Sequence, residues 1–502
     1  MNVLSERSRS LWMDVALPRF PALAEDILCD AVVVGAGIAG LSTAYELAKR
    51  GREVTVVDRG AVGGMTLRTS AHLTSELDDY YAELLKRRDQ AAAIQYLASQ
   101  SAAIDRIETI ASAEAIDCDF ARVDALLVAS GDGGEAIVRN EMVAAGRLGW
   151  DGVGPVPPPP GFRNTTLRFP HQARFHPAKY LRGLLAALER LGVRVFCDTA
   201  ATKVSENGKD VVVECDGGQR VSADMAVIAT NSPINDLVAI HTKQAPYRTY
   251  VFAAPLPKGE APDALIYDTE EPYHYVRIQP GAEHDVLIVG GEDHKSGAEN
   301  DGVGRIERLW HWAKPLFPNL GEITHAWSGQ IYEPVDYVPH LGLNPGGKRV
   351  YVITGDSGEG LTSGVAGAML IAQLATEGGS PWTEVYDPGR KTLSAVGTFV
   401  SENKDVLSNL TEHLSSGEIT KIEELSSGQG ALMRLNGKKA AVYRDGTGTV
   451  HAFSATCTHL GCIVHFNGFE KCWECPCHGS QFSAEGRVLA GPAHRDLERI
   501  DL

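Results

Sequence analysis

The 502-residue sequence predicts an α/β chain that carries a small all-β domain in its C-terminal part. Three observations support this fold class. A strand, a glycine-rich turn, a helix and a second strand follow one another over residues 30–58. Apolar strand-like runs recur over residues 240–345, and cysteines and histidines gather over residues 457–478 among short strands. Because a chain of this length exceeds what one compact core holds, we expect at least two domains.

Composition and charge exclude several classes of protein. The formal net charge is −17, which argues against a general binder of nucleic acid or of anionic membranes. No apolar run approaches the roughly 18 to 20 residues of a membrane helix, so we expect no membrane span. Residues 1–15 lack the apolar core of a secretory signal. These features predict a cytoplasmic protein.

The first unit has the pattern of a dinucleotide-binding fold. Residues 30–34 are an apolar strand, and the turn Gly35-Ala36-Gly37-Ile38-Ala39-Gly40 leads into a helix over 41–48. A second strand over 53–57 ends at Asp58. In such a βαβ unit the glycines permit a tight turn, close approach of a pyrophosphate and helix-on-strand packing, and the acid binds the ribose hydroxyls. The pyrophosphate lies at the helix N-terminus. We therefore predict a Rossmann-type domain.

Two later segments indicate that the dinucleotide is FAD rather than NAD. Residues 223–233 are an apolar strand that runs into an Ala-Thr turn. Residues 350–354 are a strand followed by Gly355-Asp356 and then by a helix of small residues over 361–376. A glycine-rich helix start places backbone N–H groups and a positive dipole against an electron-rich ring. The alternative is a further Rossmann strand and helix without ligand contact.

These motifs resemble the D-amino-acid oxidase superfamily of flavoproteins, which includes glycine oxidase, sarcosine oxidase and γ-glutamylputrescine oxidoreductase. The resemblance covers about residues 10–385 and includes the segment 63–74, which it implies lies along the flavin. Arg68 stands where some relatives carry a flavin-linking histidine, so the resemblance implies noncovalent FAD, with attachment through His72 as the alternative. The cofactor-binding residues that it implies are Gly35, Gly37, Ile38, Ala39, Gly40, Asp58, Arg59, Gly64, Thr66, Arg68, Thr69, His72, Leu73, Val204, Thr230, Gly355, Asp356, Gly358, Gly360, Leu361 and Thr362.

The segment 240–345 is expected to carry the substrate. Strands are predicted over 247–251, 273–278 and 285–291, consistent with an antiparallel sheet. In the superfamily such a sheet covers the substrate, and an arginine on the strand equivalent to 273–278 can hold a carboxylate. By position this arginine is Arg277, and His274 and Tyr275 on the same strand are the other catalytic candidates. For each aromatic residue the alternative is packing in a sheet face.

The C-terminal cluster has the spacing of a metal centre. Cys457-x-His459 and Cys475-x-x-His478 provide two thiolates and two imidazoles. This set suits a Rieske [2Fe–2S] centre with these four residues as ligands, and zinc is the alternative. The full pattern, C-x-H-L-G-C followed by C-P-C-H-G-S, resembles Rieske proteins closely and favours the iron–sulfur cluster.

Two further features follow from the resemblance to the cytochrome-complex type of Rieske protein. It implies that Cys462 and Cys477 form a disulfide between the cluster loops. Such proteins commonly place a tyrosine two residues after Ser480, where this chain has Phe482. One hydrogen-bond donor towards the cluster is thereby lost, and hydrogen bonds to the sulfurs raise the reduction potential. We therefore predict a potential below that of the tyrosine-containing proteins.

The predicted domain limits follow these motifs. An FAD-dependent oxidoreductase part spans 1–390, a linker 391–420 and the Rieske domain 421–502. Within the first part, FAD-binding segments over about 28–80, 165–235 and 345–385 surround the substrate sheet at about 240–345.

Together the two resemblances imply an FAD-dependent dehydrogenase acting on the C–N bond of a small amine or amino acid. A two-electron flavin beside a one-electron centre implies that electrons pass from flavin to cluster and on to an external acceptor protein. One alternative is the reverse flow, in which the cluster supplies a flavin monooxygenase with electrons from a donor protein. Another is that the Rieske domain is a redox-sensing docking module.

Overall fold

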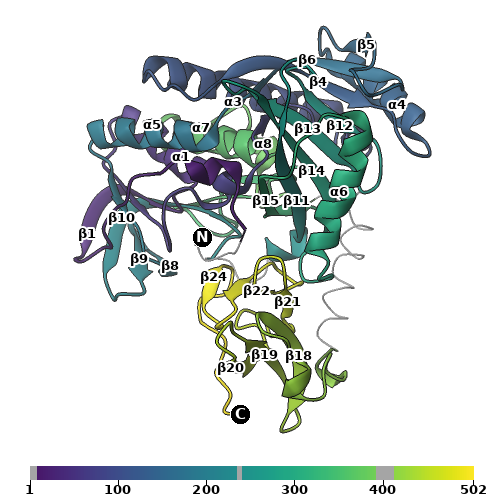
Figure 1. Ribbon diagram of the computed structural model, residues 1–502. Coiled ribbons are helices and arrows are strands. Elements are labelled where there is room, and N and C mark those ends of the chain that lie inside the picture. Colours follow the sequence, from purple (N-terminus) through teal and green to yellow (C-terminus); the bar gives the residue numbers. More distant parts are fainter. Residues whose placement is uncertain (1–7, 235–239, 392–411) are drawn as a thin grey trace.

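The computed structural model describes residues 8–234, 240–391 and 412–502. A large part contains two sheets and most of the helices, and a small β part lies below it (Figure 1). Of the predicted linker, residues 392–411 lie outside the described residues. The arrangement confirms the predicted fold class.

The first sheet is the Rossmann-type layer. Its order is β16 (His340–Leu343), β17 (Val350–Thr354), β10 (Arg220–Asn231), β1 (Ile27–Val34), β2 (Val54–Val57) and β7 (Arg194–Phe196). In addition, β9 (Asp210–Cys215) pairs with β10, and β8 (Ala201–Asn207) pairs with β9. Strand β1 pairs in parallel with β2 and β10, and β10 pairs in parallel with β17. Residues 31–34 of β1 are all buried, as expected for a parallel strand covered on both faces.

Helices cover this sheet and join the two layers. Helix α1 (Ile38–Lys49) packs against α7 (Gly360–Glu377) and α5 (Pro177–Arg190), and α3 (Gln90–Ala113) packs against α7. The remaining helices are α2 (Tyr81–Arg87), α4 (Gly134–Leu148), α6 (Gly302–Leu316) and α8 (Thr383–Tyr386). Small side chains in α1 and α7 let these two helices approach closely, since a Cβ on Gly364 would lie 3.0 Å from the Cβ of Ala39.

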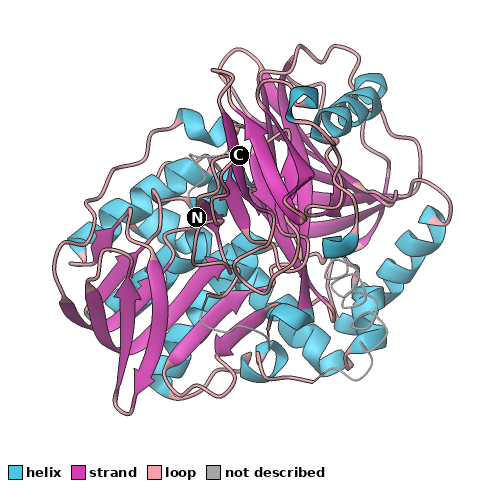
Figure 2. Ribbon diagram, turned by 90° about the horizontal axis from the view of Figure 1, so that it is seen from below, coloured by secondary structure: helices cyan, strands magenta, loops and turns pink. Residues whose placement is uncertain are grey.

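The second sheet has nine strands and stands beside the first (Figure 2). Its order is β15 (His325–Pro334), β11 (Gln244–Leu256), β14 (Asp285–Lys295), β13 (His274–Gln279), β12 (Leu265–Asp268), β4 (Ala121–Val128), β6 (Thr166–Arg174) and β3 (His72–Leu73), with β5 (Gly154–Val156) paired to β6. The predicted antiparallel pairing holds for β11, β13 and β14. Strand β15, which was not predicted, also pairs antiparallel with β11, whereas β12 and β4 are parallel. Strands β3 to β6 come from residues 72–174, outside the predicted substrate segment.

The small part consists of two antiparallel sheets. One contains β18 (Gln429–Leu435), β19 (Lys438–Arg444) and β20 (Val450–Ser454), and the other contains β21 (His465–Asn467), β22 (Cys472–Glu474), β23 (Gln481–Ser483) and β24 (Val488–Ala490). Asn436 and Gly437, both at positive φ, connect β18 to β19 in the manner of a two-residue hairpin turn.

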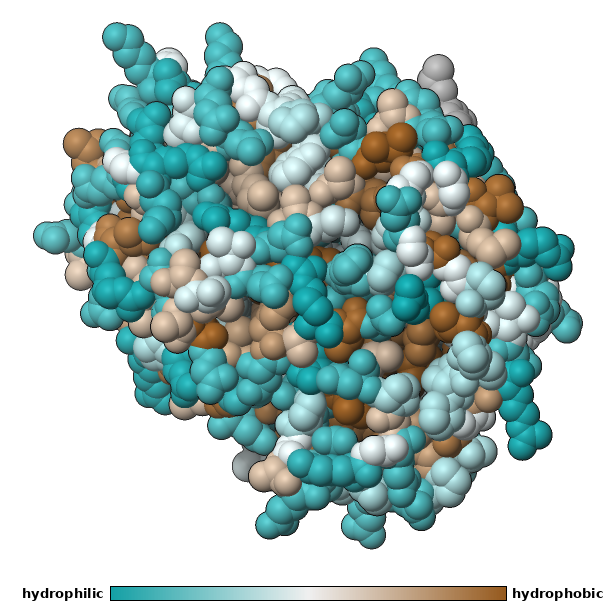
Figure 3. Space-filling view, turned by 90° about the horizontal axis from the view of Figure 1, so that it is seen from above, coloured by the Kyte–Doolittle hydropathy of each residue, from teal (hydrophilic) through white to brown (hydrophobic). Residues whose placement is uncertain are grey.

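The surface of the large part is mainly hydrophilic on the face turned away from the small part. Hydrophobic side chains form separate patches there rather than one continuous area (Figure 3). Within the described residues, no helix combines the length and the apolar character needed to cross a membrane.

Candidate functional site

A large cavity of about 1400 Å³ lies where β1, α1, α7 and the second sheet meet. It opens at the glycine turn between β1 and α1. Gly35 has φ +113°, and a Cβ on it would lie 2.3 Å from the carbonyl oxygen of Ala229. A Cβ on Gly40 would lie 1.8 Å from the carbonyl oxygen of Gly35. Only glycine fits either position, and the turn leaves the N-terminus of α1 facing the cavity.

Most residues predicted to bind the cofactor line this cavity. They are Gly35, Gly37, Ile38, Ala39, Asp58, Gly64, Thr66, Arg68, Thr69, His72, Thr230, Asp356, Gly358, Gly360 and Leu361. The size of the cavity, the glycine cradle and the two helix N-termini of α1 and α7 fit a dinucleotide together with a substrate.

Six predicted cofactor residues do not line the large cavity. Gly40, Leu73, Gly355 and Thr362 lie behind its wall, and Val204 packs against the core under the first sheet. Arg59 instead lines a smaller cavity that shares Gly35, Asp58 and Thr230 with the large one. Residues 489–491 of the small part close this smaller cavity.

Asp58 holds the glycine turn in place. One carboxylate oxygen accepts a hydrogen bond from the backbone N–H of Ala36 at 2.7 Å, and the other accepts from that of Gly60 at 2.8 Å. The carboxylate is therefore fixed at the end of β2 and at the border of both cavities, where the ribose-binding acid of a βαβ unit is expected.

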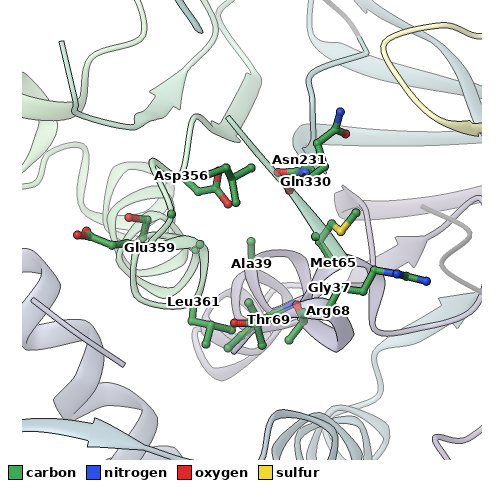
Figure 4. A pocket seen from close by; sticks show the side chains of 18 of the residues that line it. Gly37, Ala39, Met65, Arg68, Thr69, Asn231, Gln330, Asp356, Glu359 and Leu361 are labelled. Atoms are coloured by element: carbon green, nitrogen blue, oxygen red, sulfur yellow. Dashed lines mark hydrogen bonds between the residues drawn. The ribbon is translucent and has the colours of Figure 1, made fainter. Parts of the chain in front are cut away.

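Arg68 contributes to the wall of the cavity, but its guanidinium is engaged elsewhere. It donates to the carbonyl oxygens of Ser8 and Ser328 and forms an ion pair with Glu470 of the small part at 3.1 Å. The side chain points away from Asp356 and Glu359 (Figure 4). Both members of the Arg68–Glu470 pair are 0% exposed. Arg68 thus connects the two parts of the molecule.

Of the three predicted catalytic residues, only Tyr275 lines the cavity. The Arg277 guanidinium is buried and donates to the carbonyl oxygens of Ala71 and Phe175 and to Gln279 Oε1. It therefore faces backbone rather than the cavity, and the structure gives no support for a carboxylate-binding role. Burial lowers its pKa to about 9.

His274 points to the other face of β13. Its Nδ1 lies 2.7 Å from Asp268 Oδ2, and its ring stacks on Trp312 with centroids 4.4 Å apart. Side chains alternate between the two faces of a strand, so His274 faces away from the cavity that Tyr275 lines. Arg277, two residues further along β13, lies on the same face as Tyr275, but its guanidinium is bound to the carbonyl oxygens of Ala71 and Phe175.

The four predicted cluster ligands come together at one end of the small part. The rings of His459 and His478 have centroids 5.0 Å apart, and Cys457 and Cys475 are buried beside them. Hydrogen bonding with Cys475 lowers the pKa of Cys457, and the Ser480 hydroxyl acts in the same direction. The predicted disulfide between Cys462 and Cys477 is present.

This donor set fits the predicted iron–sulfur cluster. His478 Nδ1 is buried and has no hydrogen-bond partner, so it is available as a ligand. Two adjacent thiols and two imidazoles match the Cys₂His₂ ligation of a Rieske centre. Phe482 is fully buried in β23, where it supplies no donor.

The ligand loops contact the large part directly. The O–H of Tyr332 donates to the carbonyl oxygen of His478 at 3.2 Å, and Gln330 Nε2 donates to that of Gly479 at 3.1 Å. The ring of His241 lies against the rings of His459 and His478, with centroids 5.1 and 5.8 Å apart. A Cβ on Gly479 would lie 2.2 Å from the Tyr332 hydroxyl, so only glycine permits this contact.

Several residues of the site could not be found by motif. The segment 327–330 is polar and aromatic beside a glycine, which suggests a cavity wall, and Gln330 does line the cavity. Tyr332, His241 and Glu470 stand in no recognisable pattern, because each acts through a partner far away in the sequence.

Comparisons with known proteins agree with this geometry. Residues 30–374 match the family model "FAD dependent oxidoreductase", and residues 416–501 match the "Rieske [2Fe-2S] domain" model. The chain is 31% identical over 496 residues to a putative Rieske 2Fe-2S iron-sulfur protein, YhfW, of Bacillus subtilis, covering 97% of this chain and 96% of that protein.

Two further matches concern the separate parts. The glycine oxidase structure from Geobacillus kaustophilus superposes with a TM-score of 0.60 at 16% identity, covering 73% of this chain and 99% of that one. The cytochrome b6-f complex iron-sulfur subunit 1 of Nicotiana tabacum is 54% identical over 56 residues, which are 11% of this chain and 25% of that protein. FAD and a Rieske [2Fe–2S] cluster are the cofactors of these two domains. The chain therefore belongs to the FAD-dependent oxidoreductase family and carries a Rieske domain in the same polypeptide.

Proposed function

We propose that the protein is a dehydrogenase for an amine or an amino acid, and that its electrons pass from the FAD site to the Rieske centre and then to an external acceptor protein. The C–N bond of the substrate loses two electrons and two protons and becomes an imine, which water hydrolyses to a carbonyl compound. Two single-electron transfers to the acceptor balance each turnover. The fold shared with a glycine oxidase supports chemistry at a C–N bond.

One observation carries the proposed route between the two sites: Gln330 belongs to both. It lines the large cavity, and its Nε2 donates to the carbonyl oxygen of Gly479, the residue after the ligand His478. A single side chain therefore connects the cavity to a ligand loop. Buried Tyr332 makes a parallel contact with His478 itself.

FAD, when bound, supplies the two-electron chemistry, and the chain's own residues shape the place where it occurs. Tyr267, Tyr273 and Tyr275 from the second sheet wall the cavity. The Tyr275 hydroxyl lies 2.9 Å from Thr249 Oγ1. Burial raises the pKa of Tyr275 far above its usual range, so this hydroxyl stays neutral and orients groups through hydrogen bonds rather than acting as a base. We assign no general base.

Anaerobic mixing with a panel of amines and amino acids tests this proposal. Flavin bleaching is followed by absorbance, and the reduced cluster is followed by its EPR signal. We expect a substrate to bleach the flavin first and the EPR signal to rise afterwards. In the matched variant Cys457→Ser, which lacks one cluster ligand, the substrate should still bleach the flavin without any Rieske signal.

The opposite order would contradict the proposal. If a chemical reductant fills the cluster first, the flavin follows, and no amine in the panel bleaches it, electrons run inward. Oxygen-activating chemistry then becomes the better description. If flavin and cluster exchange electrons too slowly for turnover, a redox-sensing role for the Rieske domain is favoured.

A further inference from the structure

A smaller chamber adjoins the large cavity beside the second sheet. Its lining residues are Thr74, Glu76, Leu77, Asp78, Tyr80, Leu127, Tyr267, Asp268 and Tyr273. Four of them, Thr74, Asp78, Tyr267 and Tyr273, also line the large cavity, so the two spaces adjoin. The chamber is small and has room for a single small group, such as one end of a substrate whose reacting group lies in the large cavity.

The chamber contains an unsatisfied buried carboxylate. Glu76 is 5% exposed, and its Oε2 has no hydrogen-bond partner among the residues that the structure describes. A buried polar atom without a partner is costly, and the cost is offset when a ligand supplies the missing hydrogen bond. Asp78 accepts only a long hydrogen bond, 3.3 Å, from the Tyr273 hydroxyl among the contacts of its carboxylate. Asp268 is already paired with His274.

The ionisable side chains that line this space are mainly acidic. Asp356 and Glu359 add two further carboxylates on the wall of the large cavity. Among the described residues that line either space, Arg68 is the only arginine or lysine, and its guanidinium is bound to Glu470. Burial, together with Glu141 and Asp78, raises the pKa of Glu76 well above its usual range, and a cation bound beside the carboxyl would act in the opposite direction and favour its ionised form.

Aromatic rings complete the chamber. Tyr80, Tyr267 and Tyr273 contribute to its wall, and the face of a tyrosine ring attracts an ammonium group. A substrate carboxylate, in contrast, would find no cationic partner, because Arg277 faces the backbone carbonyls of Ala71 and Phe175.

We infer that this chamber binds a second ammonium group of the substrate, so that the substrate class is a diamine or polyamine rather than an amino acid. The inference rests on the proposed function for the reaction at the C–N bond. Glu76 and Asp78 are the binding residues for the distal cation, and the tyrosine rings surround it.

Series of straight-chain compounds with three to six carbons test the inference on the oxidised holoenzyme. At each length the α,ω-diamine is compared with the monoamine and with the ω-amino acid, for example 1,4-diaminobutane with 1-aminobutane and 4-aminobutanoate. Binding is measured without turnover, as the shift in melting temperature and as the change in flavin absorbance. Flavin bleaching under anaerobic conditions gives kcat/KM.

At the best length we expect the diamine to bind at least tenfold more tightly than the monoamine, and the amino acid to bind least. Glu76→Gln keeps the size of the side chain and should reduce the preference for the diamine to threefold or less, with little effect on the monoamine. The matched control is Asp79→Asn, because this neighbouring carboxylate accepts from Ser357 and lies outside the chamber. It should keep the preference.

The outcomes separate this inference from the proposed function. Equal binding of diamine and monoamine at every length overturns the inference, even where monoamines bleach the flavin. A Glu76-dependent preference for diamines without any bleaching supports the chamber and contradicts the dehydrogenase. Should Glu76→Gln fail to fold, the wild-type series alone decides.

Discussion

The contact between the oxidoreductase part and the Rieske domain has two regions of different chemistry. The ionic region consists of Arg68, Arg248, Glu470 and Glu474, whose side chains are almost completely buried. The neutral region consists of Gln330, Tyr332 and Gly479 and lies beside the predicted cluster ligand His478.

This difference suggests that the ionic region fixes how the domains dock and that the neutral region serves electron transfer. Buried ion pairs across an interface fix its geometry, because leaving either charge alone is expensive. Neutral hydrogen bonds to backbone carbonyls hold the two domains together beside the Rieske centre and add no net charge at that place. Docking and electron transfer should therefore respond to different substitutions.

The largest effect is expected from breaking the ionic region. Glu470→Gln leaves Arg68 buried without its counter-ion, which typically costs about 3–5 kcal/mol. Urea unfolding should show this loss. Glu83→Gln, which removes an exposed pair with Lys86, is the control and should cost about 1 kcal/mol or less. Equal losses in both variants would show that the ionic region does not hold the domains.

Acid should weaken the ionic region but not the neutral one. Although burial raises it, Arg68 and Arg248 lower the pKa of Glu470 overall. A carboxyl group whose pKa is lowered on folding stabilises the folded state, and this contribution is complete above the pKa of the group in the unfolded chain, about 4.3 for glutamate. The contribution is lost as the pH falls through the lower pKa of the folded state. Limited proteolysis between pH 5 and 3 should therefore show that the contact between the Rieske domain and the oxidoreductase part weakens below about pH 4. In Glu470→Gln this dependence should be smaller.

A smaller effect is expected in the neutral region from Gln330→Ala. The variant removes the side chain that joins the cavity to Gly479 and leaves that carbonyl without this donor. We expect the transfer of electrons from flavin to cluster to slow about tenfold, equivalent to about 1.4 kcal/mol in the barrier. Stability in urea should change less than in Glu470→Gln. Unchanged transfer would exclude Gln330 from the route.

The smallest effect is expected from Tyr332→Phe, which deletes one hydroxyl and keeps the ring. The variant loses the hydrogen bond to the His478 carbonyl and a long contact to Gln330. A single neutral hydrogen bond contributes about 1 kcal/mol, so a severalfold slower transfer is expected. Rapid-mixing absorbance measures the rate of this transfer. A decrease in rate as large as that in Gln330→Ala would contradict the smaller role assigned to Tyr332.

The sequence allowed local features to be predicted and left distant ones hidden. The glycine turn and the cluster ligands each lie within a short segment whose spacing reflects the chemistry directly. The prediction for Arg277 relied on its position alone, and its carbonyl partners, Ala71 and Phe175, are distant in sequence. Likewise, the pairing of Arg68 with Glu470 spans 402 positions and crosses the two domains. No short pattern encodes such contacts, because they arise only when the chain has folded.

Electron transfer within one molecule is the central claim, and flash reduction of the flavin tests it most directly. The flavin is reduced photochemically under anaerobic conditions, and the cluster is followed by absorbance and freeze-quench EPR at several protein concentrations. The docked geometry predicts that the cluster becomes reduced at a rate independent of protein concentration. A rate proportional to concentration, or a reduced flavin beside a cluster that stays oxidised, would contradict it.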